Sequence, residues 1–317
     1  LRGVKEAGKA FAFPTYFFVG CMFIVFGMGL WRLSQGTLPV LATDLPGAVE
    51  IGKEQGLLTG AAIFILLRAF ANGGSSLTGL EAISDGVALF KTPEHVNAKR
   101  TLVVMSCLLG TLVLGVSYFA HHIHAMPYES GTPTVISQIA KAAVGEGTFG
   151  SVIFIMVQLA TMLILFAGAN TTYSAFPLLC NFVATDGYLP RQLTKRGHRL
   201  AFSNGILLLA GGGLFLVVIT AGSVEHLVAF YALGVFTGFT LAGFGMTRYF
   251  KRTKPKGWKL KVFINGLAGS ISLIIVIIFS VVKFTQGAWL VLVVAPIMVA
   301  TFLRLRRQYT REQEALS

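Results

Sequence analysis

Charged residues are scarce in this chain of 317 residues. They make up 12% of it, against about 25% in a typical soluble domain. Hydrophobic residues make up 54%, and the mean hydropathy is +0.73. This composition excludes a soluble globular domain. Because a single chain with long apolar runs crosses a bilayer as helices, the sequence predicts an all-α polytopic membrane protein.

Cysteines and catalytic motifs are also few. Cys21, Cys107 and Cys180 are far apart, lie in or beside apolar segments, and have no partner at metal-binding or redox spacing. We interpret them as small buried hydrophobic residues. The sequence has no nucleophile elbow, no metal-binding His and Glu spacing, and no phosphate loop followed by Lys. It therefore predicts neither an enzyme nor a bound cofactor.

The long hydrophobic runs predict eight transmembrane spans with short loops between them, in a single transmembrane domain over residues 1–317. The predicted bounds of the spans are 14–33, 57–90, 101–121, 149–181, 203–221, 224–248, 262–282 and 286–303. In the fifth span, the run Gly211, Gly212 and Gly213 predicts close helix packing.

The basic residues follow the alternation of these loops. Of the 26 Lys and Arg residues, 21 fall in the termini and every second connection, four fall in the other connections, and Arg68 lies within a span. Because loops on the cytoplasmic side concentrate positive charge, we expect a multi-pass protein of the plasma membrane with both ends of this chain in the cytoplasm. The same pattern explains the net charge of +13 without nucleic acid. Membrane lipids are the expected partners, and a homodimer is compatible with this class.

The second predicted span, 57–90, is the most informative stretch of the chain. A helix crosses a bilayer with about 20 apolar residues, so this segment is longer than one crossing requires. Its surplus lies near 72–79, where glycines and serines favour local unwinding. Unwound backbone survives in a bilayer only where protein or water covers it, and in transporters such breaks hold substrate and ions.

The candidate binding residues lie in and after this break. Gly73, Gly74 and Gly79 would supply its backbone groups. Ser76, Thr78 and Glu81 would supply side-chain oxygens, and residues 78 and 81 share a face if the helix restarts there. A carboxyl group within a span indicates an ion or proton site. The alternative is that the small residues only allow close helix packing, with Glu81 held by a neighbouring donor.

Two further candidates lie later in the chain. Tyr231, beside Gly234 and Thr237, can offer its hydroxyl oxygen to a cation or can be a core aromatic residue. Asp186 and Arg191 follow the fourth span, where they can form part of an inner gate or an interfacial salt bridge.

Three stretches of sequence resemble one family of transporters. GGSSLTGLEAISDGV, FKTPEHVNAKRTL and ANTTYSAFPLLCNFVATDGYLPRQL followed by RLAFSNGI are similar to the amino acid, polyamine and organocation (APC) superfamily. Within it they resemble the branch of KimA-type and KUP-type potassium importers and related permeases. The resemblance implies a LeuT-like fold of five plus five inverted-repeat helices with two more appended. This chain would contain helices 5 to 12, one of them discontinuous, and would be a fragment without the first four.

The resemblance also implies roles for individual residues. Thr78 and Glu81 match the pair that binds the ion in the potassium importers, and Glu81 is implicated in proton coupling. Tyr231 is similar to a tyrosine that helps to coordinate the cation. The expected function is therefore proton-coupled potassium uptake, with bound K⁺ and a coupling proton. The alternatives are a proton-coupled amino acid or polyamine permease, and a membrane sensor or subunit that does not transport.

Overall fold

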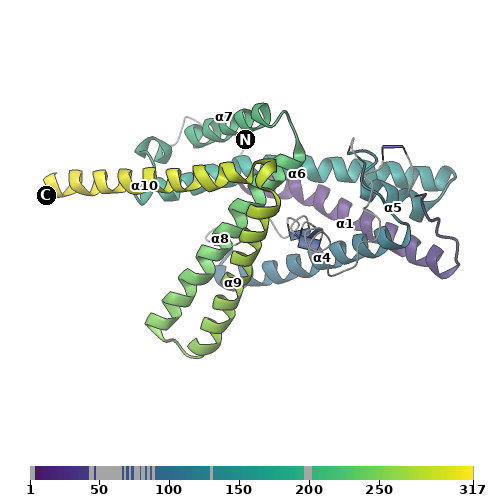
Figure 1. The fold of residues 1–317 in the computed structure, drawn as a ribbon, viewed down its shortest axis with the longest axis horizontal. Helices are drawn as coiled ribbons and strands as arrows, with labels where there is room; N and C mark the ends of the chain where they lie inside the picture. Colours follow the sequence, from purple (N-terminus) through teal and green to yellow (C-terminus); the bar gives the residue numbers. More distant parts are fainter. Residues whose placement is uncertain are drawn as a thin grey trace. The chain divides into compact units, whose positions relative to one another are not determined.

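The protein is described from a computed structural model. The structure describes residues 4–42, 46–47, 66–67, 69–70, 73–74, 79, 83, 86–87, 90–128, 131–195 and 202–316. These residues form helices and no β-strand (Figure 1). The elements are α1 (Val4–Ser34), α4 (Glu94–His122), α5 (Val135–Val144), α6 (Thr148–Thr185), η3 (Arg191–Thr194), α7 (Ser203–Ile219), α8 (Val224–Thr253), α9 (Trp258–Val282), η4 (Phe284–Ala288) and α10 (Trp289–Leu316).

Six of the described helices are long and apolar enough to cross a membrane: α1, α4, α6, α8, α9 and α10. Together with the absence of strands in the described ranges, this confirms the prediction of an all-α polytopic membrane protein. Helix α7 has 17 residues and is a shorter apolar helix. Most of the predicted span 57–90 lies outside the described residues, so the number of crossings stays a prediction.

The chain divides into two compact units, which we describe separately. Unit 1 comprises Leu1–Glu54 and Arg100–Ser174, and unit 2 comprises Gln55–Lys99 and Ala175–Ser317. One boundary between the units falls inside α4 and another inside α6. The predicted single transmembrane domain over 1–317 stays a prediction.

Helices α1 and α4 interlock in the core of unit 1. The rings of Phe26 and Phe119 stack with their centroids 5.6 Å apart. A Cβ atom added to Gly29 would lie 2.6 Å from the Phe119 ring, and one added to Gly115 would lie 2.5 Å from the Phe26 ring. Each aromatic side chain therefore occupies the space that a glycine on the opposite helix leaves.

Helix α5 is a short amphipathic helix anchored to the rest of unit 1 by polar side chains. Arg32 of α1 donates a 2.9 Å hydrogen bond to the Ala142 carbonyl, at the C-terminal end of α5, where a cation meets the negative end of the helix dipole. The buried Gln138 side chain accepts from the Met126 amide and donates to the Met126 carbonyl. These bonds satisfy backbone groups that the loop before α5 would otherwise leave unpaired.

In unit 2, α8 and α9 form an antiparallel hairpin (Figure 1). A Cβ atom added to Gly243 would lie 2.7 Å from the Gly269 Cα. The two backbones therefore approach at a point where neither helix carries a side chain, as in other close contacts between transmembrane helices.

A break in helical geometry separates α9 from α10. Gly287 in η4 has a φ of 107°, a left-handed value that glycine adopts at little cost. A Cβ atom added there would also lie 2.8 Å from the ring of Phe230 in α8. Both the backbone angle and the aromatic contact therefore require glycine.

One sequence expectation about small residues is wrong, and another stays a prediction. The structure places no described atom within 4 Å of a Cβ atom added to Gly211, Gly212 or Gly213, so these glycines make no close contact with the described helices. Cys21 and Cys180 are buried as predicted, but Cys107 on α4 is exposed. A free cysteine behaves as a small hydrophobic residue, and such residues also occur on exposed surfaces.

Candidate functional site

The interrupted segment before α4 changes its backbone conformation at Gly79. Gly73, Gly74 and Ile83 are helical, whereas Gly79 has a φ of 101°. An α-helix has a φ near −63°, so regular helix does not pass through Gly79. The described part of the predicted break therefore has two helical glycines and one left-handed glycine.

Gly74, in the interrupted segment, lies beside two phenylalanine rings of unit 2. A Cβ atom added to Gly74 would lie 3.7 Å from the Phe236 ring of α8 and 3.9 Å from the Phe279 ring of α9. Both phenylalanines are fully buried in a cluster with Leu233 and Ile275, and their ring centroids are 6.0 Å apart. The segment thus packs where α8 and α9 meet.

Tyr231 of α8 faces the left-handed glycine. A Cβ atom added to Gly79 would lie 3.9 Å from the Tyr231 hydroxyl oxygen, and 47% of the Tyr231 residue is exposed. The structure therefore brings together two of the sequence-predicted site residues from distant parts of the chain. Thr78 directly precedes Gly79 in the sequence and Glu81 follows it by two positions.

The other predicted residues of this site lie outside the described residues. They are Ser76, Thr78 and Glu81. Their roles in binding and proton coupling stay predictions.

Helix α8 leaves space beside Tyr231. Gly234 and Gly238 lie three and seven positions after it, on the same helical face. No described atom is within 4 Å of a Cβ atom added to either glycine. On the same helix, Thr237 and Thr240 donate their hydroxyl protons to the Leu233 and Phe236 carbonyls at 2.7 and 2.8 Å.

This arrangement has the chemistry of a site for a hard cation. Hydroxyl and carbonyl oxygens are the ligands that such ions prefer. Tyr231 supplies one hydroxyl, and the backbone departs from helical geometry at Gly79, as it does at the ion sites of transporters.

The second predicted feature, the inner gate of Asp186 and Arg191, lies where α6 ends. The Gly187 and Tyr188 amides donate to the Ala184 and Val183 carbonyls, and Gly187 has a φ of 79°. These bonds form a Schellman motif. The chain therefore reverses after Asp186 and leads directly into η3.

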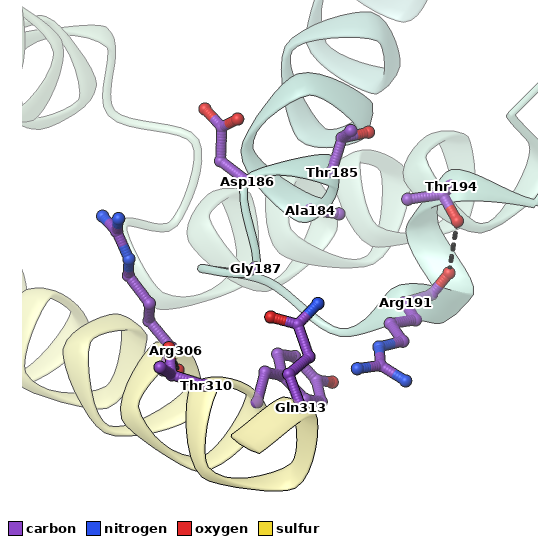
Figure 2. Close-up of a pocket in the computed structure, with 10 residues that line it drawn as sticks. Ala184, Thr185, Asp186, Gly187, Arg191, Thr194, Arg306, Thr310 and Gln313 are labelled. Atoms are coloured by element: carbon purple, nitrogen blue, oxygen red, sulfur yellow. Dashed lines mark hydrogen bonds between the residues drawn. The ribbon is translucent and has the colours of Figure 1, made fainter. Parts of the chain in front are cut away.

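A polar cleft of about 480 Å³ separates this turn from α10 (Figure 2). Its lining includes Asp186, Arg191, Arg306, Tyr309 and Gln313. In Figure 2 the Asp186 and Arg306 side chains extend on one side of the cleft, and Arg191 lies on the other. Both predicted gate residues thus line one cleft.

Arg191 does not pair with Asp186 in this structure. Its guanidinium lies 3.9 Å from the Glu312 carboxylate of α10 and 4.5 Å from the centre of the Tyr309 ring. In the reverse direction, the Arg306 guanidinium of α10 lies 4.5 Å from the centre of the Tyr188 ring. Two reciprocal cation–π contacts therefore hold the turn against α10. The role of Asp186 and Arg191 as a gate stays a prediction.

Sequence reasoning missed the α10 half of this cleft. Its signal was present as two Tyr and Arg pairs, each three positions apart: Tyr188 with Arg191, and Arg306 with Tyr309. On α10 this spacing puts Arg306 and Tyr309 on one face, whereas Tyr188 precedes η3 in the turn. The sequence alone did not show that the two pairs face each other.

Comparison with known proteins identifies two similarities. Residues 1–302 match the family model described as amino acid permease. The whole chain is 39% identical to the potassium transporter KimA of Bacillus subtilis (strain 168) over 318 residues. The chain spans about half the length of this curated relative, 50% of it.

Proposed function

Because the chain belongs to the amino acid permease family, we propose that it forms part of a secondary transporter whose function is proton-coupled potassium uptake. Membership in a permease family confirms the prediction that the chain is not an enzyme. The potassium assignment is supported by the similarity to a potassium transporter along the entire chain. The observation that carries it is the contact between Tyr231 and the left-handed Gly79.

In this proposal the ion loses its water at the interruption. The hydroxyl oxygens of Tyr231, Thr78 and Ser76, with backbone carbonyls of the glycine-rich segment, replace the hydration shell of K⁺. Neutral oxygens suit a large monovalent cation because they bind it without holding it too tightly to leave. Glu81 supplies the negative charge and carries the coupling proton.

The protein resides in the cell membrane with both ends of this chain on the cytoplasmic side. The concentration of 21 Lys and Arg residues in alternate connections supports this orientation. Asp186 and Arg191, in the cleft beside α10, then lie at the cytoplasmic end of the transport path, where they contribute to an inner gate.

The test is the substitution Glu81→Gln in the complete protein. It preserves the size of the side chain and removes its charge and proton. Potassium uptake driven by a proton gradient should fall to background in cells that lack other potassium importers. Glu146→Gln, an exposed acid in unit 1, serves as the matched control and should retain uptake. Proton-driven uptake at the wild-type rate in Glu81→Gln would remove Glu81 from the mechanism.

A second candidate function is a proton-coupled amino acid or polyamine permease, which the description of the matching family favours. In that case the backbone amides freed by the interruption bind a substrate carboxylate, and Glu81 binds an amine or is structural. A competition experiment on potassium uptake distinguishes the two candidate functions. Unlabelled amino acids and polyamines should leave potassium uptake unchanged if the first proposal is right, and should be transported themselves if the second is right.

A further inference from the structure

The cleft between the α6 turn and α10 contains opposite charges that do not neutralise each other. Asp186 and Arg306 both line it. Among the residues that the structure describes, neither side chain forms a salt bridge, whereas Arg191 pairs with Glu312 at the same cleft. A carboxylate and a guanidinium that line one cleft without pairing suit a ligand that carries both charges.

The positive group in this cleft is held in place. The guanidinium of Arg306 lies over the Tyr188 ring at 4.5 Å, which restricts its rotation. Stacking occupies the face of a guanidinium and leaves its N–H groups free at the edge. Those groups match the oxygens of a phosphate in a two-pronged hydrogen bond.

The remaining polar groups favour an ammonium ion on the other side. The hydroxyls of Thr185, Thr194 and Thr310 donate to the carbonyls of Asn181, Arg191 and Arg306. Their protons are therefore engaged, so toward a further group these hydroxyls can act only as acceptors. Together with the Asp186 carboxylate they offer acceptors to N–H donors.

The cleft lies just beyond the ends of two apolar segments, where lipid headgroups are expected. Asp186 follows Ala184, the last buried apolar residue of α6, by two positions, and Arg306 follows Leu303 by three. At 1.5 Å per residue these are rises of about 3 and 4.5 Å. The headgroup layer on each side of a bilayer is roughly 5–8 Å thick.

A second cleft of about 440 Å³ adjoins this polar site, and its lining includes the charged residues Arg307, Arg311 and Glu314. It shares Arg306 and Thr310 with the first cleft, and its lining extends to Leu303 on α10. The additional arginines extend the positive surface around Arg306, and the apolar portion of a lipid bound there would leave the protein beside Leu303.

We propose that this cleft binds a phospholipid with a phosphate and a primary ammonium group, the phosphoethanolamine type of headgroup. Arg306 binds the phosphate and Asp186 binds the ammonium. The bound lipid bridges the α6 turn and α10. This site is separate from the proposed ion site at Tyr231, and its occupation can be measured without transport.

Native mass spectrometry of the complete protein, purified in detergent, tests the proposal with three lipids. Phosphatidylethanolamine carries both groups, phosphatidylglycerol lacks the ammonium, and phosphatidylcholine has an ammonium without N–H donors. We expect phosphatidylethanolamine to bind about tenfold more tightly than either of the others, since a hydrogen bond to a charged group accounts for a difference of this order.

Two substitutions test which part of the headgroup each charged residue binds. Asp186→Asn should abolish the preference for phosphatidylethanolamine over phosphatidylglycerol, whereas Arg306→Gln should weaken binding of both lipids about tenfold. Arg304→Gln on the same helix lies outside this cleft and should leave the preference unchanged. Equal binding of the three lipids, or an Asp186→Asn protein that keeps the preference, would overturn the proposal. Soluble glycerophosphoethanolamine that displaced the lipid at equal concentration would show that the ligand is a free zwitterion instead.

Discussion

The two polar features of unit 2 are built in opposite ways. The site at Tyr231 depends on glycines that let a backbone approach α8, and its described part has no charged side chain. The cleft beside α10 depends on long charged side chains that tyrosine rings hold in place. Backbone geometry tolerates little change, whereas exposed charges contribute small energies. The first site should therefore be sensitive to added methyl groups and the second to changes of charge.

The largest expected effect is that of Gly79→Ala. An alanine at a φ of 101° is strained by about 1–3 kcal/mol, so the interruption should shift and displace its oxygens from Tyr231. We expect potassium uptake to fall more than tenfold.

The control is Gly110→Ala on α4, where an added Cβ atom meets nothing within 4 Å. Uptake by Gly79→Ala at the level of this control would show that the left-handed glycine is unimportant for the site.

The contact between α8 and α9 should be nearly as sensitive. Gly243→Val places a side chain against the Gly269 backbone, and overpacking of this kind costs about 1–3 kcal/mol. The thermal unfolding midpoint in detergent should fall by several degrees. Gly245→Val, two positions away in open space, carries the same helix propensity cost and should have a much smaller effect. Equal midpoints for the two variants would contradict the close contact.

A smaller effect is expected for Tyr231→Phe. This substitution keeps the ring and removes the oxygen that faces Gly79, at a cost of about 1 kcal/mol. The apparent affinity for potassium should weaken about fivefold. Tyr249→Phe, near the end of the same helix, is the matched control. An unchanged affinity in Tyr231→Phe would exclude its hydroxyl as a ligand.

The smallest effect should come from the stack at the cleft. A double-mutant cycle of Tyr188→Leu and Arg306→Gln, measured by chemical unfolding, should give a coupling free energy of about 0.5–1 kcal/mol, as for other exposed cation–π pairs. Tyr188→Phe should retain the coupling because the ring face is kept. A coupling energy of zero would show that the two side chains are neighbours without attraction.

Some features of the molecule could be predicted from local sequence. Seven of the eight predicted spans overlap with described helices, from α1 to α10. Long apolar runs and the basic residues that flank them indicate the position of a helix without knowledge of distant residues. The glycine-rich segment was recognised in the same way, and its left-handed residue proved to be Gly79 rather than Gly73 or Gly74. A run of glycines shows that the backbone is free to depart from a helix, but not at which residue it does so.

Partners across the chain were harder to predict. The sequence suggested Asp186 as the neighbour of Arg191, since they are close in sequence, yet the structure pairs Arg191 with Glu312. The Schellman turn after α6 directs Arg191 toward α10, which the sequence spacing of the two residues does not reveal. The same limitation applies to Gly211 to Gly213, which make no close contact with the described helices, since a small residue permits a contact without requiring one.

The amino-acid sequence by itself determined that this chain is a multi-helix membrane protein, where its helices lie, and to which family it is similar. These properties follow from hydropathy, charge and motifs that are read over short windows. Only the tertiary structure decided that Tyr231 meets Gly79, that Gly243 meets Gly269, and that Arg306 stacks on Tyr188. Such contacts depend on how helices cross, and that is set by the packing of whole surfaces against each other.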